Sequence, residues 1–348
     1  SICGSLQPLL HDAAIVARID CLQSFARLAV ERRYVRPTLD DGKVIDIRQG
    51  RHPVIETLMP VGEEYIPNDV RLDDRQQQIM MITGPNMSGK SALLRQTALI
   101  ILMAQMGSFV PAASAHIGVV DKIFTRVGAS DNISQGESTF MVEMLESASI
   151  LNNISDRSIV LLDEIGRGTS TYDGISIAWA MVEYLHNHPT AHAKTLFATH
   201  YHELTELEGT LDGVNNYCIA VKENGDDIVF LRKIIKGGAD KSYGIQVAKL
   251  AGVPDTVIER AKELVADLSD ADISLKARDI AQYSKKQEKL VDSYKKVDDL
   301  EVKQMSLFDT VSDNDIVADI KNLDIGHMTP IDALNTLYKL QEKINNRW

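Results

Sequence analysis

The chain has 348 residues, 44% of them hydrophobic, so it can bury a substantial core and form two or three domains. Its net charge of −12 and pI of about 5.2 argue against a region whose main task is to grip DNA phosphates, which needs a basic surface. Three scattered cysteines favour neither a disulfide framework nor a metal site, and no apolar run is long enough to cross a membrane. These features together predict a cytoplasmic protein.

The first segment, residues 1–38, is predicted to be helical. Apolar residues recur at helical spacing over 6–34, which indicates a helix packed on a core. The chain begins at Ser1 and enters this pattern almost at once, so we expect it to be a piece of a longer protein. A polar stretch after Pro37 ends the segment, and a short strand is predicted at 44–47.

From about residue 69, short apolar runs alternate with helical patterns. Strands are predicted at 79–83, 123–127, 158–163 and 194–199. Helices are predicted at 91–106, 139–154, 175–187 and 203–207. The strands show no polar alternation, which indicates a sheet that is covered on both faces. A three-layer α/β domain is therefore predicted over 39–238, ending in a hairpin at 214–235.

The remainder divides into three predicted segments. Residues 239–269 form a helix-turn-helix around Gly252-Val253-Pro254. Residues 270–314 are rich in charged and polar side chains with few large apolar ones, which is typical of a flexible tether. Residues 315–348 form a last helical pair, in which Thr329 and Pro330 are well suited to begin a helix.

The strongest motif is a phosphate-binding loop between the 79–83 strand and the helix that follows it. It reads Gly84, Pro85, Asn86, Met87, Ser88, Gly89, Lys90 and Ser91, a complete G-x-x-x-x-G-K-S. Its glycines let backbone N–H groups curl around phosphate oxygens, and the helix N-terminus adds positive charge. Lys90 is placed to contact the β- and γ-phosphates of ATP, and the Ser91 hydroxyl to bind Mg²⁺.

Two further strands deliver polar side chains that suit nucleotide hydrolysis. The apolar run 159–162 ends in Asp163, a candidate Mg²⁺ ligand, and Glu164, a candidate general base for the attacking water. His200 follows the 194–199 strand, where it can sense a γ-phosphate by a hydrogen bond. We therefore predict an ATPase in which Lys90, Glu164 and His200 carry the catalytic roles.

Several longer segments resemble the MutS family of DNA mismatch repair proteins, in particular its bacterial members. The phosphate loop is similar to that family's loop, although Ser88 and Ala92 differ from its usual residues. The other similar segments, in chain order, are Gly50–Pro53, Ser138–Met144, Asp163–Gly174 and Ala198–Tyr201. The resemblance covers roughly residues 40–268 and implies a P-loop NTPase fold of the ABC-type ATPase class.

The resemblance also implies roles for individual residues. ATP sites in this family are shared across a dimer, so Ser138 is expected to approach the γ-phosphate bound by the partner subunit. Asn86 is expected to position the γ-phosphate or water, and Tyr65 to stack on adenine. The helix-turn-helix is expected to pack on the partner's ATPase domain rather than on DNA, because its second helix carries few basic residues besides Arg260 and Lys262.

Further partners are implied in the same way. Gln304-Met305-Ser306-Leu307-Phe308 resembles the peptide by which bacterial repair proteins bind the replication sliding clamp, and residues 315–348 resemble a region that promotes higher self-association. The family binds mismatched double-stranded DNA through N-terminal domains with a Phe-x-Glu motif, which is absent from this sequence. Residues 1–38 resemble the end of the lever domain that joins those domains to the ATPase. MutL is an expected repair partner, and we expect a nucleoid-associated protein that contacts no membrane.

Two alternative interpretations compete with this one. A MutS paralogue that acts on recombination intermediates or stalled ribosomes normally ends in a small nuclease module, and no such segment follows residue 270. In the second, the chain is a non-catalytic dimerisation and clamp-docking region that binds nucleotide only for structural reasons. The presence of Glu164, the candidate general base, argues against this interpretation.

Overall fold

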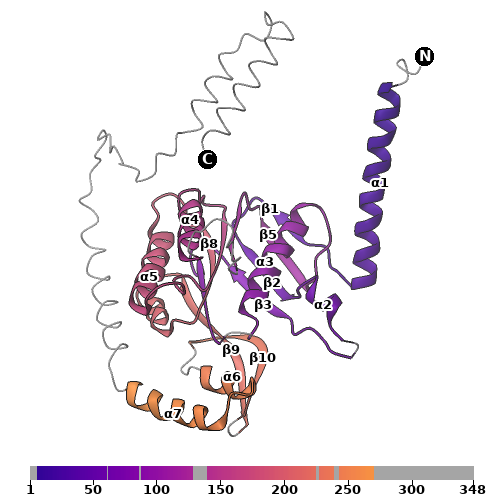
Figure 1. Ribbon diagram of the computed structural model, residues 1–348. Helices are drawn as coiled ribbons and strands as arrows, with labels where there is room; N and C mark the ends of the chain where they lie inside the picture. Colours follow the sequence, from indigo (N-terminus) through magenta and orange to yellow (C-terminus); the bar gives the residue numbers. More distant parts are fainter. Residues whose placement is uncertain are drawn as a thin grey trace, which may run out of the picture. The chain divides into compact units, whose positions relative to one another are not determined.

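The computed structural model describes residues 6–60, 62–85, 88–127, 139–224, 227–238 and 243–269 (Figure 1). The predictions for Asn86, Met87, Ser138, the tether, the clamp-like peptide and the last helical pair lie outside these residues. Two sheets and several helices make up the described part, which confirms the mixed α/β class.

The larger sheet has six strands in the order β10-β9-β4-β8-β7-β6. Its strands are β4 (Ile79–Thr83), β6 (Ile123–Arg126), β7 (Ile159–Asp163), β8 (Lys194–Thr199), β9 (Val214–Asn224) and β10 (Asp227–Lys236). All neighbours are parallel except β9 and β10, which form the predicted antiparallel hairpin. The four strands predicted before the hairpin are present within one residue of their expected bounds.

A smaller sheet was not predicted, apart from one of its strands. Its order is β1-β5-β2-β3, and it comprises β1 (Thr38–Asp40), β2 (Ile45–Gly50), β3 (Asn68–Leu72) and β5 (Ser114–Gly118). Helix α3 (Lys90–Gln105) packs in one hydrophobic cluster with apolar residues of both sheets. The smaller sheet and α3 therefore cover one face of the larger sheet.

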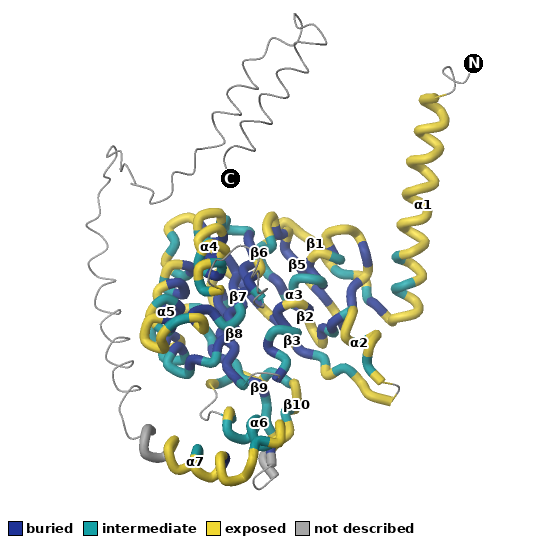
Figure 2. The backbone as a smooth tube through the Cα atoms, in the orientation of Figure 1, coloured by how far each residue is buried: buried dark blue, intermediate teal, exposed yellow. Residues whose placement is uncertain are grey.

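The opposite face of the larger sheet is covered by α4 (Thr139–Leu151), α5 (Thr171–Asn187) and the 3₁₀ helix η3 (His202–Gly209). Successive β4 residues alternate between the two cores, since Met80 and Ile82 belong to one and Ile79 and Met81 to the other. This burial on both faces confirms the prediction drawn from the unbroken apolar strands (Figure 2).

Helix α5 begins four residues before its predicted start. The Ser170 hydroxyl accepts a hydrogen bond from the Asp173 backbone N–H at 3.3 Å and caps the helix there. The helix-turn-helix prediction is matched by α6 (Gly244–Leu250) and α7 (Asp255–Ser269).

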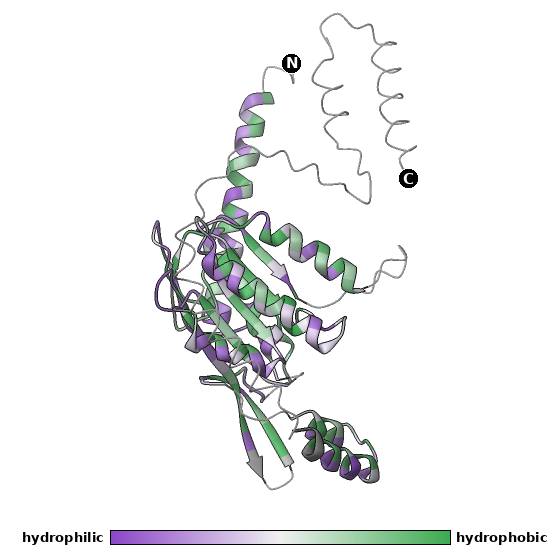
Figure 3. Ribbon diagram, turned by 90° about the vertical axis from the view of Figure 1, so that its left-hand side faces the viewer, coloured by the Kyte–Doolittle hydropathy of each residue, from purple (hydrophilic) through white to green (hydrophobic). Residues whose placement is uncertain are grey.

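Helix α1 (Leu6–Arg32) has the predicted extent, but the expectation that it packs on a core is wrong. None of its residues is buried, and Leu9, Val16 and Leu22 each expose more than half of their surface. Figure 3 shows hydrophobic and hydrophilic residues mixed along this helix. Without one apolar stripe the helix has no single face to lay on the domain, and among the described residues the contacts that hold it lie at its C-terminal end.

That end is fixed by a small group of polar contacts. Arg33 adopts a left-handed conformation (φ 52°), and the Arg51 guanidinium donates to the Arg32 carbonyl at 3.2 Å. Arg51 also pairs with Glu56 at 2.7 Å. Glu56 lies in α2 (Ile55–Leu58). The ring of the buried His52 accepts hydrogen bonds from the N–H groups of Val54, just before this helix, and of Ile55, its first residue. These contacts join the last turn of α1 to α2.

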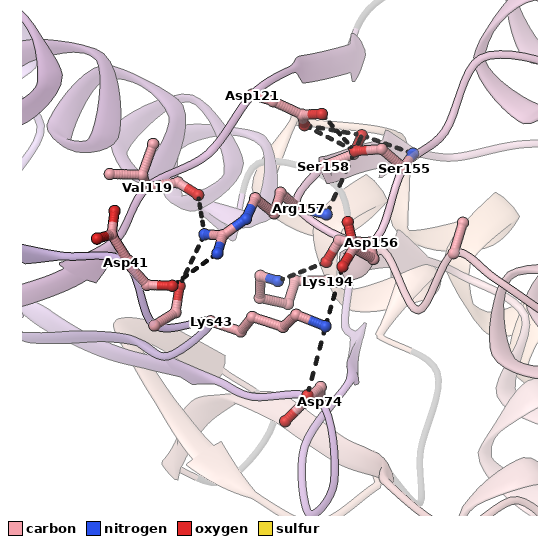
Figure 4. A network of polar contacts seen from close by, with 12 residues as sticks. Asp41, Lys43, Asp74, Val119, Asp121, Ser155, Asp156, Arg157, Ser158 and Lys194 are labelled. Atoms are coloured by element: carbon pink, nitrogen blue, oxygen red, sulfur yellow. Dashed lines mark hydrogen bonds and ion pairs between the residues drawn. The ribbon is translucent and has the colours of Figure 1, made fainter.

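A second polar network links the two sheets at the amino ends of β7 and β8 (Figure 4). The Arg157 guanidinium donates to the carbonyls of Asp41, Gly42 and Val119 at 2.6, 3.1 and 3.3 Å. The buried Lys194 ammonium donates to the Asp156 carbonyl at 3.3 Å, and burial lowers the pKa of Lys194. The cluster lies at the opposite end of β7 and β8 from Asp163 and His200.

Candidate functional site

The order of the larger sheet explains how distant motifs come together. β4, β8 and β7 are neighbours, with Thr83 paired to Thr199 and Asp163 paired to Ala198. Parallel strands end at a common edge, so the phosphate loop after β4, His200 after β8 and Asp163 at the end of β7 share one edge of the sheet. The described part of the phosphate loop is therefore close to Asp163 and His200.

The phosphate loop has the backbone that its glycines predict. Gly84 and Gly89 have φ values of 147° and 106°, which side chains rarely tolerate. Lys90 begins α3 and is almost fully buried, and its ammonium donates to the carbonyls of Gly84 and Pro85, the latter at 3.1 Å. Burial lowers the pKa of Lys90, and an anionic ligand would oppose that effect.

Ser91 and Asp163 form a candidate Mg²⁺ site. The Ser91 hydroxyl donates to Asp163 Oδ2 at 2.5 Å. The other oxygen, Asp163 Oδ1, is buried and has no hydrogen-bond partner among the residues that the structure describes. Burial raises the pKa of Asp163, so a cation beside it would be stabilising. A hydroxyl and an unpaired carboxylate oxygen suit Mg²⁺, which takes few protein ligands and completes its shell with phosphates and water.

Glu164 faces the phosphate-loop lysine. Its Oε1 lies 3.7 Å from Lys90 Nζ, and its Oε2 accepts from Arg167 at 2.6 Å. Glu164 has a left-handed backbone (φ 54°), and its N–H donates to the Ala198 carbonyl at 2.9 Å. Such strain in a non-glycine residue costs about 1–2 kcal/mol and is typical of functional positions. Arg167 was not singled out by sequence, although it lies in the Asp163–Gly174 segment.

His200 is partly buried at the end of β8, and burial lowers its pKa. At neutral pH its ring is therefore uncharged and can both donate and accept a hydrogen bond. The ring of Tyr201 lies against it, with 4.2 Å between the ring centroids.

A pocket of about 180 Å³ lies beside the start of α3. Tyr65 lines it together with Gly89 and Ala92, and the Tyr65 hydroxyl donates to Gln96 at 2.9 Å. Burial raises the pKa of Tyr65 to about 12, so its hydroxyl stays neutral. Because Gly89 belongs to the phosphate loop, the pocket adjoins that loop.

Arg232 also lines this pocket and was missed by sequence analysis. It lies on β10 at a bulge in the pairing with β9, and its φ of 53° is left-handed. Asn68 holds the bulge, since its side chain donates to the Arg232 carbonyl at 2.9 Å and accepts from the Ile234 N–H at 2.8 Å. Asn68 and Arg232 are 164 residues apart, so no local pattern could reveal the contact.

The chain is similar to known proteins over nearly its whole length. Residues 80–269, more than half of the chain, match the family model for MutS domain V. The chain belongs to the MutS family. It is 54% identical over 344 residues to the DNA mismatch repair protein MutS of Parabacteroides distasonis. The alignment covers 98% of this chain and 38% of that protein.

Other MutS proteins give similar values. The identity is 56% over 336 residues for Bacteroides thetaiotaomicron and 53% over 350 residues for Ruminiclostridium cellulolyticum. These alignments cover 95% and 99% of the chain but only 38% of each relative. The chain thus spans well under half the length of these MutS relatives and contains their domain V region. Within the described residues, no helix has the length and apolar character needed to span a membrane.

Proposed function

We propose that this MutS-family region binds ATP with Mg²⁺ and hydrolyses it to ADP and phosphate. The observation that carries the proposal is the convergence of Lys90, Asp163 and Glu164 at one edge of the sheet, with Glu164 3.7 Å from the Lys90 ammonium. The sheet, the loop and the helix that follows it support the expected P-loop NTPase fold of the ABC-type class.

In the proposed reaction, Lys90 contacts the β- and γ-phosphates, and backbone N–H groups of the loop bind their oxygens. Ser91 and Asp163 would hold Mg²⁺, which would offset phosphate charge when bound. Glu164 accepts a proton from the water whose oxygen attacks the γ-phosphorus, and the bond to the bridging oxygen breaks. His200, with its uncharged ring, hydrogen-bonds near the γ-phosphate and reports its loss.

The resemblance supports roles for residues around this core. Tyr65 is proposed to stack on adenine, which its place in the pocket beside Gly89 favours. Asn86 is proposed to position the γ-phosphate, and Ser138 to complete the partner subunit's site. We propose the following domain organisation. The lever end is 1–38, the ATPase domain 39–238 and the dimerisation segment 239–269. The tether is 270–314 and the self-association segment 315–348.

The coupling to DNA is proposed from the relatives. Because those proteins are named DNA mismatch repair proteins, we propose that nucleotide state in this region controls binding of mismatched DNA by domains outside the chain. MutL and a sliding clamp bound at Gln304–Phe308 are the proposed protein partners.

Hydrolysis is tested by comparing ATP turnover of the chain with that of Glu164→Gln. We expect the variant to bind ATP and lose at least about 100-fold in turnover, because general-base catalysis contributes about 10²–10⁴-fold. Glu31→Gln, on the exposed face of α1, is the matched control and should behave like the parent. Equal turnover in Glu164→Gln and the parent would refute the catalytic role.

Site sharing is tested by mixing two variants, Lys90→Ala and Ser138→Ala, each expected to be inactive alone. After random exchange about half of the dimers contain one of each, and each of these has one intact site. Activity should therefore recover to about one quarter of the parent value. Activity that stays at the level of the separate variants in dimers shown to exchange would contradict shared sites.

A further inference from the structure

The peptide of Gly166, two residues after Glu164, is held from both sides. Its N–H donates to Glu143 Oε1 at 2.6 Å, and its carbonyl accepts from the Tyr201 hydroxyl at 2.9 Å. Both bonds are buried. A carboxylate is costly to bury unless its oxygens are bonded, so Glu143, which is 7% exposed, is a specific anchor rather than an incidental contact.

The backbone around this peptide is packed so closely that no side chain fits at either of two glycines. Gly166 has a φ of 85°, and a Cβ added to it would lie 2.6 Å from the Gly174 carbonyl oxygen. A Cβ added to Gly174 would collide with the Gly166 carbonyl and the Tyr201 hydroxyl. A displacement of Glu143 or Tyr201 therefore cannot be absorbed by the loop and must move the Gly166 peptide.

Glu164 lies between this peptide and a second fixed point. Its N–H is bonded to the Ala198 carbonyl of β8 at 2.9 Å, and its left-handed backbone (φ 54°) is maintained only if the chain on both sides is fixed. The direction of the Glu164 carboxylate thus depends on where Gly166 is held.

The two anchors come from different elements. Glu143 lies on α4, one turn after its first residue Thr139, and the buried Arg126 at the end of β6 lies 3.6 Å from its Oε2. Tyr201 follows His200 directly, and its ring packs on the histidine. Displacement of α4 or of the segment after β8 therefore reaches the same peptide.

We propose that Glu143 and Tyr201 are positioning residues that set the Glu164 carboxylate through the Gly166 peptide, so that the start of α4 and the His200 segment both control hydrolysis. This inference rests on the proposed ATPase function. It assigns the two residues no contact with nucleotide.

The experiment uses the 348-residue chain and measures three quantities for each variant: amide hydrogen exchange at Gly166, the Kd for ATP and the turnover rate. Glu143→Ala removes the acceptor for the Gly166 N–H, and Tyr201→Phe removes only the hydroxyl. Glu143→Gln keeps an acceptor oxygen and tests rescue. The matched control is Glu146→Ala, since Glu146 lies on the same helix and pairs with the same Arg126 at 2.9 Å without a bond to Gly166.

We expect exchange at Gly166 to rise by about tenfold or more in Glu143→Ala, because the bond that protects the amide is gone. Turnover should fall by about 10- to 100-fold in Glu143→Ala and Tyr201→Phe, while the Kd for ATP changes by less than about threefold, since a misplaced catalytic group slows the reaction without weakening binding. Glu143→Gln should recover most of the loss, and Glu146→Ala should match the parent in all three measurements.

The results separate the two proposals. If the parent hydrolyses ATP and Glu143→Ala changes neither exchange nor turnover, the positioning inference is wrong and the ATPase proposal stands. If the parent binds ATP without hydrolysing it, the ATPase proposal fails, and unchanged exchange in Glu143→Ala would overturn the Gly166 anchor as well. A loss of ATP affinity equal to the loss of turnover would also overturn it, because that pattern indicates general damage to the site.

Discussion

Replacing Asn68 with alanine tests how the β10 bulge and the pocket beside the phosphate loop are held. Asn68 is 5% exposed, and its side chain makes two well-placed hydrogen bonds on either side of the bulge, to the Arg232 carbonyl at 2.9 Å and from the Ile234 N–H at 2.8 Å. These bonds connect β3 of the smaller sheet to β10 of the larger one. The substitution removes both, together with a longer bond from the Asn68 side chain to the Ile66 carbonyl at 3.3 Å, and leaves the backbone groups partly desolvated.

The expected cost follows from these contacts. A hydrogen bond contributes about 0.5–1.5 kcal/mol net, so the loss of two lowers the free energy of unfolding by about 2 kcal/mol. The bulge also stores strain, because a left-handed arginine costs about 1–2 kcal/mol. Arg232→Gly should therefore stabilise the parent by about 1 kcal/mol. Asn68→Ala frees the bulge to relax, so in that background Arg232→Gly should raise the free energy of unfolding by less. The two substitutions are therefore expected to be coupled by about 1 kcal/mol.

The assay is urea unfolding of the parent, the two single variants and the double variant. Asn215→Ala is the control, since its side chain donates to the Gln76 carbonyl at 2.8 Å in an exposed setting, and it should cost less than Asn68→Ala. Two results would refute the reasoning. One is a free energy of unfolding for Asn68→Ala within about 0.5 kcal/mol of the parent value, and the other is a double variant whose change equals the sum of the two single changes.

Three further predictions concern charge. Burial lowers the pKa of His200 from its usual 6.5, so the unfolded chain takes the proton more readily, and the free energy of unfolding should fall as pH drops from 7 towards 5. In urea unfolding, His200→Gln should show a smaller fall than the parent. Equal falls in the two proteins would count against this role of His200. Lys194→Met should raise the free energy of unfolding at pH 7 by about 1 kcal/mol, because the buried charge is lost and the volume is kept. That gain should shrink as pH rises towards the ordinary lysine pKa of 10.5, because the lowered pKa lets the folded parent lose the proton before the unfolded chain does. A variant less stable than the parent at pH 7 would contradict this prediction. Asp163→Asn should raise the Mg²⁺ concentration needed for half-maximal ATP binding by about tenfold without changing ATP binding in EDTA, and an unchanged Mg²⁺ dependence would argue against this ligand.

Much of the larger sheet could be predicted because its strands are continuous apolar runs flanked by strong motifs. Ile79–Thr83 and Lys194–Thr199 have the bounds expected, and Ile159–Asp163 differs by one residue. The principle that parallel strands end at a common edge then places Lys90, Asp163 and His200 together. The motifs and this principle are therefore sufficient to locate the candidate site.

The smaller sheet could not be predicted in the same way. β3 and β5 are no shorter than several strands of the larger sheet, but polar residues interrupt them and the three-residue β1, and all three are exposed or only partly buried, so they lack a continuous apolar run. β5 also lies more than 70 residues from its partner β1, and pairing at that distance is not a local property of the sequence. Sequence analysis missed Arg232 as a pocket residue for a related reason. Its place in the pocket depends on a bulge that Asn68 holds from another sheet.

Because α1 is attached at one end, a small rotation at that end produces a large displacement at the other. The helix has 27 residues and is thus about 40 Å long, while its base rests on the contacts of Arg51 with the Arg32 carbonyl and with Glu56 of α2. A tilt of about 5° at that base displaces the far end by roughly 3–4 Å. Ile55, next to Glu56, lines the pocket beside the phosphate loop. If a change in the pocket rotates α2 and the base of α1 by such an angle, the distant end of α1 moves by several ångströms, because the displacement grows with the length of the helix.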